Sequence, residues 1–327
     1  MKICIFGAGA IGGFVAARLS QVPGVEVSVV ARGEHLAAIR ERGLRLTSPS
    51  GDVTARVTAT DRPETLGKQD VVFISLKQHQ LTSALAGIAT LLGPDTMVLP
   101  PTTGIPYWYF HGLAGPHAGR QIPRLDPGGQ QWQVLSPERA VGCVYWVAAE
   151  VPEPGVIHHD GALLRFPIGE PDGSESPRVT RLAKAMNDAG MNAQVVPDIR
   201  AWIWAKMISS LSWNPLGVLT QATNDMLTND PAVVQLVRRV MREAEVVAEA
   251  LGVKSWPITI DQRIEAARNS GKHKMSMLQD WERGRPLEID VLTDSVQAMR
   301  ELAGVTTPTI DEVYALLRIR AKAAGRL

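Results

Sequence analysis

Cysteine is scarce in this sequence, and its scarcity excludes two classes of protein. The 327 residues contain two cysteines, Cys4 and Cys143. Two thiols cannot supply the disulfide framework of a small secreted protein or the ligands of a cysteine-rich zinc site. The chain also opens on a short apolar segment, 2–6, that meets Gly7 at once, where a signal peptide would carry a longer apolar core. We therefore expect a cytoplasmic protein in a reducing compartment.

An excess of charge of one sign is also missing, and so are long hydrophobic runs. The 34 Lys and Arg residues balance 33 Asp and Glu residues, which gives a formal net charge of +1. A nucleic-acid partner is not expected, because neutralising a run of phosphates needs a surplus of basic residues. No apolar run reaches the length of about 18 residues that a membrane-spanning helix needs, so no membrane partner is expected either.

A glycine-rich motif follows the first apolar segment. Residues 7–12 read GAGAIG, and a helix-like stretch follows at 14–19. In a dinucleotide-binding turn, Gly7 would permit the bend, Gly9 would let the pyrophosphate approach and Gly12 would let the helix pack on the strand. The helix N-terminus would offer N–H groups and partial positive charge to the phosphates. The residues expected to bind the cofactor here are Gly7, Ala8, Gly9, Ala10, Ile11 and Gly12.

The end of the second strand-like segment, 25–30, indicates which cofactor binds. NAD sites usually place an acidic residue there to bind the ribose 2′-hydroxyl, whereas this chain has Ala31-Arg32-Gly33. The guanidinium fork of Arg32 can instead pair with a 2′-phosphate. The pattern favours NADP over NAD, and the alternative is a solvated arginine in a loop.

The arrangement of strand-like and helix-like segments predicts an α/β fold with two domains, as the length also indicates. Further strand-like runs at 71–76 and 97–99 alternate with helices, which is typical of a Rossmann-type, doubly wound parallel sheet. Residues 94–137 are rich in proline and glycine and predict a long loop. Strand-like runs return at 140–149 and 163–168, and His158-His159-Asp160 is interpreted as a turn between them.

Strand signals stop after about residue 198. The stretches that indicate helices are 199–219, 232–251, 258–270, 275–283, 287–303 and 308–323. We therefore expect an NADP-binding Rossmann-like domain at 1–197 and an all-helical substrate and catalytic domain at 198–327.

Three polar residues recur at a spacing of four in the first of these helices. Lys206, Ser210 and Asn214 lie on one slowly drifting stripe between apolar residues. Polar groups buried without partners cost roughly 1–3 kcal/mol each, so the stripe must meet partners or a cavity. Pro215 would remove one helical hydrogen bond and bend the axis. The alternative is an exposed lysine on an ordinary amphipathic helix.

Several separate motifs occur in a specific order along the chain. They are residues 7–12, Ser75-Leu76-Lys77 with Gln80, Thr103-Gly104, 200–204 with Lys206, Asn214-Pro215-Leu216, 276–280, Gly284-Arg285 and Glu288-Ile289-Asp290. In these motifs the chain resembles the ketopantoate reductase (2-dehydropantoate 2-reductase) family from residue 1 to about 320. The resemblance implies an NADP-dependent oxidoreductase, acting on CH–OH donors, that reduces ketopantoate to pantoate in pantothenate biosynthesis.

Carried over by position, the resemblance assigns catalytic roles to Lys206 and Glu288. Lys206 would give a proton to the keto oxygen while the nicotinamide delivers hydride, and partial burial would lower its pKa from about 10.4. The implied cofactor contacts beyond the glycine-rich motif are Arg32, Lys77, Gln80, Thr103 and Glu288. The implied contacts of a small 2-oxo acid substrate are Lys206, Ser210, Asn214, Ser276 and Thr103. The alternatives are helix capping by Glu288 or Ser276 and a surface charge at Lys77.

Two positions depart from the family pattern. Thr103 and Ser210 stand where asparagine is usual, and a hydroxyl lacks the separate donor and acceptor of an amide. Four aromatic residues, 107–110, follow Thr103-Gly104 and either line the site or cover the sheet. The alternative hypotheses are a bulkier 2-oxo acid substrate and a non-catalytic NADP-binding regulator. No metal site is expected, and a homodimer is compatible with the sequence.

Overall fold

The structure, a computed structural model, describes residues 1–101 and 103–326, apart from the side chains of residues 162 and 163. The chain forms two compact units, Met1–Thr102 with Pro106–Ile199 and Thr103–Ile105 with Arg200–Leu327. It therefore passes from one unit to the other three times. No sequence signal marks Thr103–Ile105 as part of the second unit. The assignment of cofactor binding to residues 1–197 and of catalysis to residues 198–327 stays a prediction.

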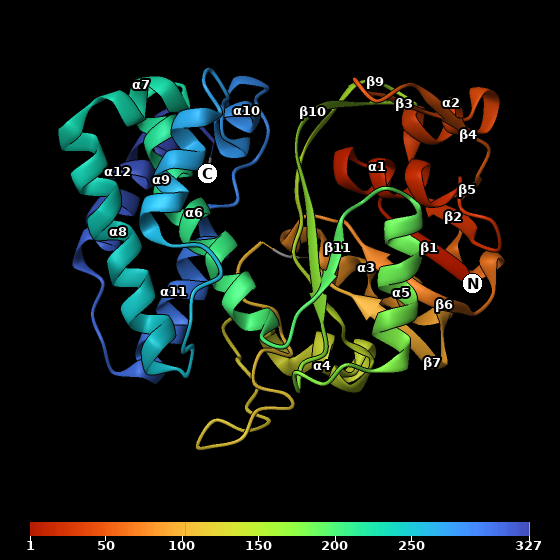
Figure 1. The fold of residues 1–327 in the computed structure, drawn as a ribbon, viewed down its shortest axis with the longest axis horizontal. Coiled ribbons are helices and arrows are strands. Elements are labelled where there is room, and N and C mark those ends of the chain that lie inside the picture. Colours follow the sequence, from red (N-terminus) through yellow and green to blue (C-terminus); the bar gives the residue numbers. More distant parts are fainter. Residues whose placement is uncertain (102, 327) are drawn as a thin grey trace. The chain divides into compact units, whose positions relative to one another are not determined.

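A five-stranded parallel sheet forms the centre of the first unit (Figure 1). Its strands, in spatial order, are β5 (Thr58–Thr60), β2 (Glu26–Val30), β1 (Lys2–Phe6), β6 (Gln69–Ile74) and β7 (Leu92–Leu99). The helices that follow β1, β2 and β6 are α1 (Ala10–Leu19), α2 (Gly33–Arg42) and α3 (Gln78–Leu91). Because β1 pairs with β2 on one side and β6 on the other, the topological switch point lies between β1 and β6. The predicted Rossmann-type sheet is confirmed.

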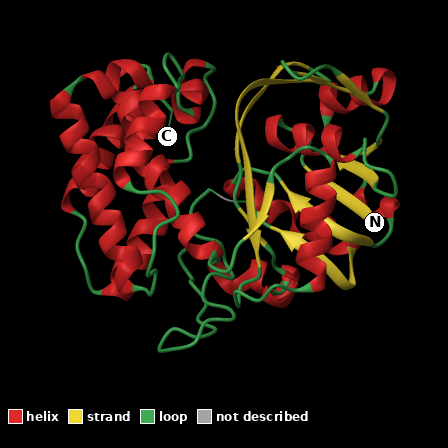
Figure 2. Cartoon of the chain, viewed as in Figure 1, coloured by secondary structure: helices red, strands yellow, loops and turns green. Residues whose placement is uncertain are grey.

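A second, mixed sheet of six strands completes the first unit. Four of its strands lie in the order β11 (Ala193–Val195), β10 (Val156–Gly169), β3 (Leu44–Thr47) and β4 (Val53–Ala55). The other two, β8 (Gly142–Cys143) and β9 (Trp146–Glu153), both pair with β10. The strands β9 and β10 form the long antiparallel hairpin seen in Figure 2.

The interpretation of His158-His159-Asp160 as a turn is wrong, because these residues lie inside β10. His158 pairs with Glu150 and His159 with Ala149 across the hairpin. His158 and Asp160 are exposed, whereas His159 is buried and meets the Phe14 ring edge-on at 5.0 Å between centroids. This alternation of exposed, buried and exposed side chains fits a strand with one face on the core.

Most of the predicted loop at 94–137 consists of turns and irregular chain, and most of its residues between 112 and 130 are exposed. It contains the end of β7 and the short helix α4 (Gln130–Leu135). The four aromatic side chains at 107–110 are at most 2% exposed. A Cβ atom placed on Gly142 of β8 would lie 3.0 Å from the Trp108 ring, so this ring packs directly on the strand. The packing favours the interpretation that the aromatic residues cover the sheet.

The second unit is helical (Figure 2). Its helices are α6 (Ile199–Thr220), α7 (Asn224–Asn229), α8 (Pro231–Ala250), α9 (Ile260–Asn269), α10 (Ser276–Glu282), α11 (Ile289–Ala303) and α12 (Pro308–Ala323). Six agree with the predicted stretches, and α7 was not predicted because six residues are too few for a helical periodicity. In the described part of the chain, no strand follows β11, so the predicted α/β fold with a helical C-terminal region is confirmed.

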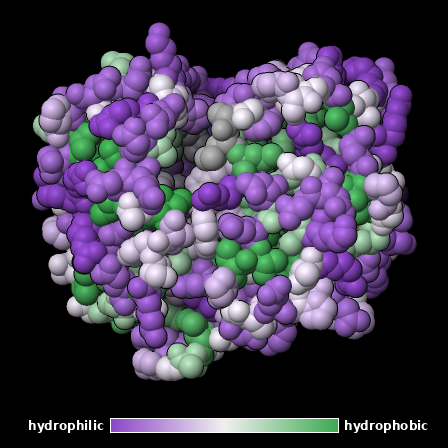
Figure 3. Space-filling model, viewed as in Figure 1, coloured by the Kyte–Doolittle hydropathy of each residue, from purple (hydrophilic) through white to green (hydrophobic). Residues whose placement is uncertain are grey.

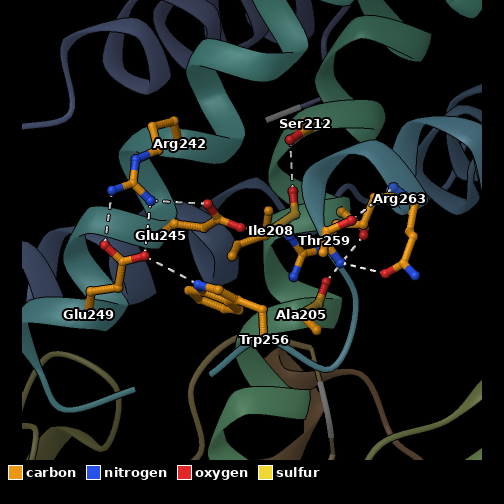
Figure 4. A network of polar contacts seen from close by, with 11 residues as sticks. Ala205, Ile208, Ser212, Arg242, Glu245, Glu249, Trp256, Thr259 and Arg263 are labelled. Atoms are coloured by element: carbon orange, nitrogen blue, oxygen red, sulfur yellow. Dashed lines mark hydrogen bonds and ion pairs between the residues drawn. The ribbon is translucent and has the colours of Figure 1, made fainter. Parts of the chain in front are cut away.

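A buried ion pair joins α8 to α9 within the second unit (Figure 4). The Arg263 guanidinium donates to Glu245 at 3.0 Å, and the two side chains are 2% and 6% exposed. Arg242 contacts the other Glu245 oxygen at 3.3 Å and also binds Glu249. The Trp256 indole donates to Glu249 at 3.2 Å, and its ring lies under Arg263. Each carboxylate oxygen of the buried Glu245 therefore contacts an arginine, as a buried charge requires.

The surface seen in Figure 3 is mostly hydrophilic, with hydrophobic residues in small separate patches. Between residues 1 and 326, residue 102 apart, no helix combines the length and the apolar character needed to cross a membrane. The same residues contain no cluster of three His, Cys, Asp or Glu side chains suited to hold a metal ion.

Candidate functional site

The glycine-rich loop joins β1 to α1 and leaves no room for a side chain at one position. Gly7 has a φ of +103°, and its N–H donates to the Val30 carbonyl at 3.0 Å. A Cβ on Gly12 would lie 2.0 Å from the Gly7 carbonyl oxygen, so only glycine fits there. Gly9 is the N-cap of α1, and a Cβ on it would meet nothing within 4 Å. Gly9 is exposed, and Ala10 and Ile11 are half-buried. The first N–H groups of the helix can therefore bind an anion that approaches past Gly9.

The end of β6 supports this loop from the other side of the switch point. The Ser75 hydroxyl donates to the Gly7 carbonyl at 2.5 Å, and the Ser75 N–H donates to the Phe6 carbonyl at 3.0 Å. Lys77, half-buried, is the N-cap of α3, and the Gln80 side chain accepts from the Lys77 N–H at 3.3 Å. Gln80 therefore caps α3, and its predicted cofactor contact stays a prediction. The sequence did not predict that Ser75 supports the loop, because this role depends on a contact with Gly7, 68 residues away.

The end of β2 presents Arg32, and a histidine follows one turn later. Arg32 is exposed and is the N-cap of α2. The half-buried His35 ring lies 2.7 Å (Nε2) from the Ala8 carbonyl oxygen and 3.0 Å (Nδ1) from the Gly155 N–H. Because a carbonyl only accepts and an N–H only donates, these partners fix the neutral tautomer with hydrogen on Nε2. Burial lowers the pKa of His35, against the opposing hydrogen bond to Ala8. The sequence pattern did not identify His35.

The polar stripe predicted in the second unit lies on α6. Lys206 and Ser210 are half-buried, and Asn214 is buried at 5% exposure. The Asn214 side-chain oxygen accepts from the Met277 N–H at 3.4 Å, which brings Asn214 to the start of α10. Ser276 is the first residue of α10 and is exposed, whereas the N-cap is Met275. The alternative of Ser276 as the N-cap is therefore wrong.

Helix α11 carries the predicted residue Glu288 at its start and contacts the segment that follows Thr103. Glu288 is the half-buried N-cap of this helix, and its side chain makes no capping hydrogen bond. The Ile105 N–H donates to the Ser295 hydroxyl at 3.0 Å. Gly104 has a φ of +79°, and a Cβ on it would lie 2.5 Å from that hydroxyl. The segment Thr103–Ile105 thus packs on α11 only because residue 104 is glycine.

These contacts define two groups of predicted residues. The first unit gathers the glycine-rich loop, Lys77 and Gln80 at the carboxyl ends of β1 and β6, with Arg32 at the end of β2. These groups can bind phosphates through N–H dipoles and cationic side chains. The second unit carries an ammonium, a carboxylate and neutral polar groups on α6, α10 and α11. This combination can move a proton and bind a carboxylate or hydroxyl group.

Two family models match the chain. The model described as "Ketopantoate reductase PanE/ApbA" matches residues 3–105, and that described as "Ketopantoate reductase PanE/ApbA C terminal" matches residues 198–321. The 2-dehydropantoate 2-reductase of Mesorhizobium japonicum is 48% identical over 325 residues, which are 99% of each chain.

Solved structures agree with these matches. A crystal structure from Ralstonia solanacearum, assigned as a ketopantoate reductase, is 37% identical with a TM-score of 0.90 and covers 100% of this chain and 99% of its own. The 2-dehydropantoate 2-reductase of Geobacter metallireducens is 26% identical with a TM-score of 0.86, covering 98% of this chain and 100% of its own. By sequence and by fold, this chain belongs to the ketopantoate reductase family.

Proposed function

We propose that this chain catalyses the NADPH-dependent reduction of ketopantoate to pantoate, a step of pantothenate biosynthesis. The observation that carries the proposal is the dinucleotide-type loop, in which Gly12 admits no side chain and Gly9 leaves the start of α1 open. The Mesorhizobium japonicum relative, 48% identical over nearly the whole chain, bears the name of this activity.

The residues of the first unit fit a nicotinamide dinucleotide. The N–H groups at the start of α1 would bind its pyrophosphate, and Lys77 stands at the strand edge where doubly wound sheets bind ligands. When bound, the cofactor supplies the hydride that reduces the keto carbon. Arg32 is exposed directly after β2 and would pair with a 2′-phosphate, which supports NADPH over NADH.

Replacing Arg32 by alanine tests this cofactor preference. A charge-assisted hydrogen bond contributes about 1.5–3 kcal/mol, so Arg32→Ala should weaken NADP⁺ binding by about tenfold or more. Binding of NAD⁺, which lacks the phosphate, should change little. Arg56→Ala is the matched control, because Arg56 is also exposed in the first unit. Equal losses for both dinucleotides, measured by calorimetry, would contradict the preference for NADP.

The second unit would supply the proton and the substrate contacts. Lys206 would donate a proton to the keto oxygen and stabilise the negative charge that develops there. Glu288, at the start of α11, would bind the hydroxyl that forms and the cofactor ribose. The residues proposed to bind the substrate carboxylate and hydroxyl groups are Thr103, Ser210, Asn214 and Ser276.

A lysine substitution separates catalysis from cofactor binding. Lys206→Ala should lower kcat by roughly 10²–10⁴-fold, the usual contribution of a general acid, while NADP⁺ affinity is retained. Lys254→Ala is the control, because Lys254 is an exposed lysine of the same unit. A wild-type enzyme without turnover, or an unchanged kcat in Lys206→Ala, would refute the catalytic assignment.

A bulkier 2-oxo acid is the second candidate substrate. Thr103 and Ser210 offer fewer hydrogen-bonding groups than asparagine would, which favours a less polar side chain on the substrate. The buried aromatic residues at 107–110 do not support this candidate. This candidate would be excluded if the kcat/KM for ketopantoate lay within about 10⁴–10⁸ M⁻¹s⁻¹ and exceeded the kcat/KM for larger 2-oxo acids. A homodimer also stays a prediction, which analytical ultracentrifugation can check.

A further inference from the structure

His35 connects the glycine-rich loop to a turn of the second sheet. Its Nε2–H donates to the Ala8 carbonyl at 2.7 Å, and its Nδ1 accepts from the Gly155 N–H at 3.0 Å. Ala8 belongs to the loop between β1 and α1, and Gly155 to the turn between β9 and β10. One imidazole on α2 therefore joins three segments of the first unit.

The Gly155 end of this connection is held in place by other contacts. Gly155 has a φ of +82°, and its carbonyl accepts from the Arg45 N–H at 2.9 Å. A Cβ on Gly155 would lie 2.9 Å from the Ala38 methyl group, so the turn packs directly on α2. Through His35, the glycine-rich loop is therefore held at a fixed position relative to the β9–β10 turn.

The hydrogen bond from His35 to the Ala8 carbonyl orients the N–H of Gly9, which would contact a phosphate. The carbonyl of Ala8 and the N–H of Gly9 belong to the same peptide unit, and in a planar trans peptide these two bonds point in opposite directions. The cis form does not occur in the described chain. By holding the Ala8 carbonyl, the His35 ring turns the N–H of Gly9, the exposed N-cap of α1, away from itself.

The contact depends on the neutral form of His35. A proton on Nδ1 would place a second donor against the Gly155 N–H, which has no acceptor to offer. Charged residues flank His35 on the elements that it joins and on the strand beside the turn, and all of them are exposed: Arg32, Glu34 and Arg42 on or at the start of α2, Glu153 on β9 and Arg45 on β3. Arg42 donates to the Pro154 carbonyl of the turn at 3.5 Å. The loop itself, residues 7–13, contains no titratable side chain.

We propose that His35 is a positioning residue of the cofactor loop, and that its neutral imidazole aims the Gly9 N–H at the pyrophosphate of the bound dinucleotide. Acid then weakens cofactor binding, because the protonated ring cannot hold both the loop and the turn. The proposal rests on the proposed function, since it assumes that a dinucleotide binds this loop.

The test measures dinucleotide affinity as a function of pH. Dissociation constants for NAD⁺ and NADP⁺ are measured by calorimetry between pH 5 and 8 for the wild type, His35→Leu and His35→Gln. NAD⁺ is the more informative ligand, since it carries no 2′-phosphate that titrates in this range. The control is His158→Leu, because His158 is exposed on β10 in the same unit.

At pH 7.5, His35→Leu should weaken both dinucleotides by about tenfold, as expected for the loss of two neutral hydrogen bonds. The wild-type affinity for NAD⁺ should fall toward that of His35→Leu in acid, and both His35 variants should lose this pH dependence. The KM for the cofactor should rise, while kcat at saturating cofactor and the KM for ketopantoate stay near wild type. A general structural defect would not produce this division.

An affinity and a pH profile that match the wild type in both His35 variants would overturn the proposal. If the variants do not fold, the ring ¹⁵N shifts of His35 in the wild type decide the question. A pKa that coincides with the loss of NAD⁺ affinity would support the proposal, and one that does not would overturn it. A wild type that binds neither dinucleotide at any pH would instead refute the proposed function.

Discussion

The hydroxyl of Ser295 accepts a hydrogen bond from the Ile105 N–H at 3.0 Å, across 190 residues of sequence. The same hydroxyl donates to the Val291 carbonyl at 2.7 Å, so both of its hydrogen-bonding functions are used. The segment that it holds includes Thr103, a predicted cofactor and substrate contact. The position of Thr103 therefore depends on a serine that no motif marks.

Removing this hydroxyl should reduce stability and weaken ligand binding. Ser295→Ala leaves a buried N–H of Ile105 without its acceptor, at a cost of about 1–3 kcal/mol in the free energy of unfolding. The KM for substrate should also rise. Ser212→Ala is the control, since the buried Ser212 hydroxyl donates to the carbonyl of Ile208 one turn back within the same helix. Equal effects of both substitutions in urea unfolding would argue against a specific role.

Two alanine substitutions in the glycine-rich loop should have different effects, one on stability and the other on dinucleotide binding. Gly12→Ala places a Cβ 2.0 Å from the Gly7 carbonyl oxygen, so the loop must distort and the protein should be strongly destabilised. Gly9→Ala meets nothing within 4 Å and should melt near the wild-type temperature. It should nevertheless weaken dinucleotide binding, because the added methyl group lies where the pyrophosphate approaches. Melting curves with and without NADP⁺ distinguish the two; a Gly9→Ala protein that binds normally would contradict the phosphate site.

The buried ion pair between α8 and α9 predicts a strong asymmetry between two glutamates. Glu245→Leu leaves the buried Arg263 charge without its partner and should cost about 3–5 kcal/mol. Glu249→Gln, at a side chain 37% exposed, should cost less than about 1 kcal/mol. The double variant Glu245→Leu/Arg263→Met should recover most of the loss, since it removes both charges. Denaturant unfolding would measure all three, and a double variant no better than the single one would contradict this account.

Acid should destabilise the folded chain partly through His35. Burial lowers the pKa of His35, so the unfolded chain binds a proton at this ring more readily than the folded chain does. The contribution of His35 to the free energy of unfolding is therefore complete above a pH of about 6.5 and is lost as the pH falls toward the lowered pKa. His35→Gln should flatten this part of the stability profile. An unchanged slope between pH 5 and 7 would show that the ring titrates normally.

The parts of the fold that sequence predicts are those with a local signal. The glycine motif after a buried strand and the helical periodicity beyond residue 198 involve neighbouring residues, and both were predicted correctly. The second sheet was only partly predicted, because β3, β4 and β11 are three or four residues long. In β10, the residues His158-His159-Asp160 carry turn-like polarity that the burial of His159 overrides.

The candidate site shows the same division. The Lys206–Ser210–Asn214 stripe follows from helical geometry alone, and the structure places all three on α6. The contacts that orient the predicted residues, from Ser75, His35 and Ser295, join positions 27 to 190 residues apart. One sequence contains no pattern that pairs such positions, so these contacts could not be predicted, although Ser75 lies in one of the motifs.

The three-residue excursion Thr103–Ile105 limits how this protein can be divided. A C-terminal fragment that begins at residue 200 would lack the segment that packs beside Val291 and Ser295, and the N-terminal fragment would keep that segment without these two partners. The two units are therefore not interchangeable modules. A chimera with a relative has to exchange residues 103–105 together with residues 200–327. Otherwise residues 103–105 of one protein would pack against α11 of the other.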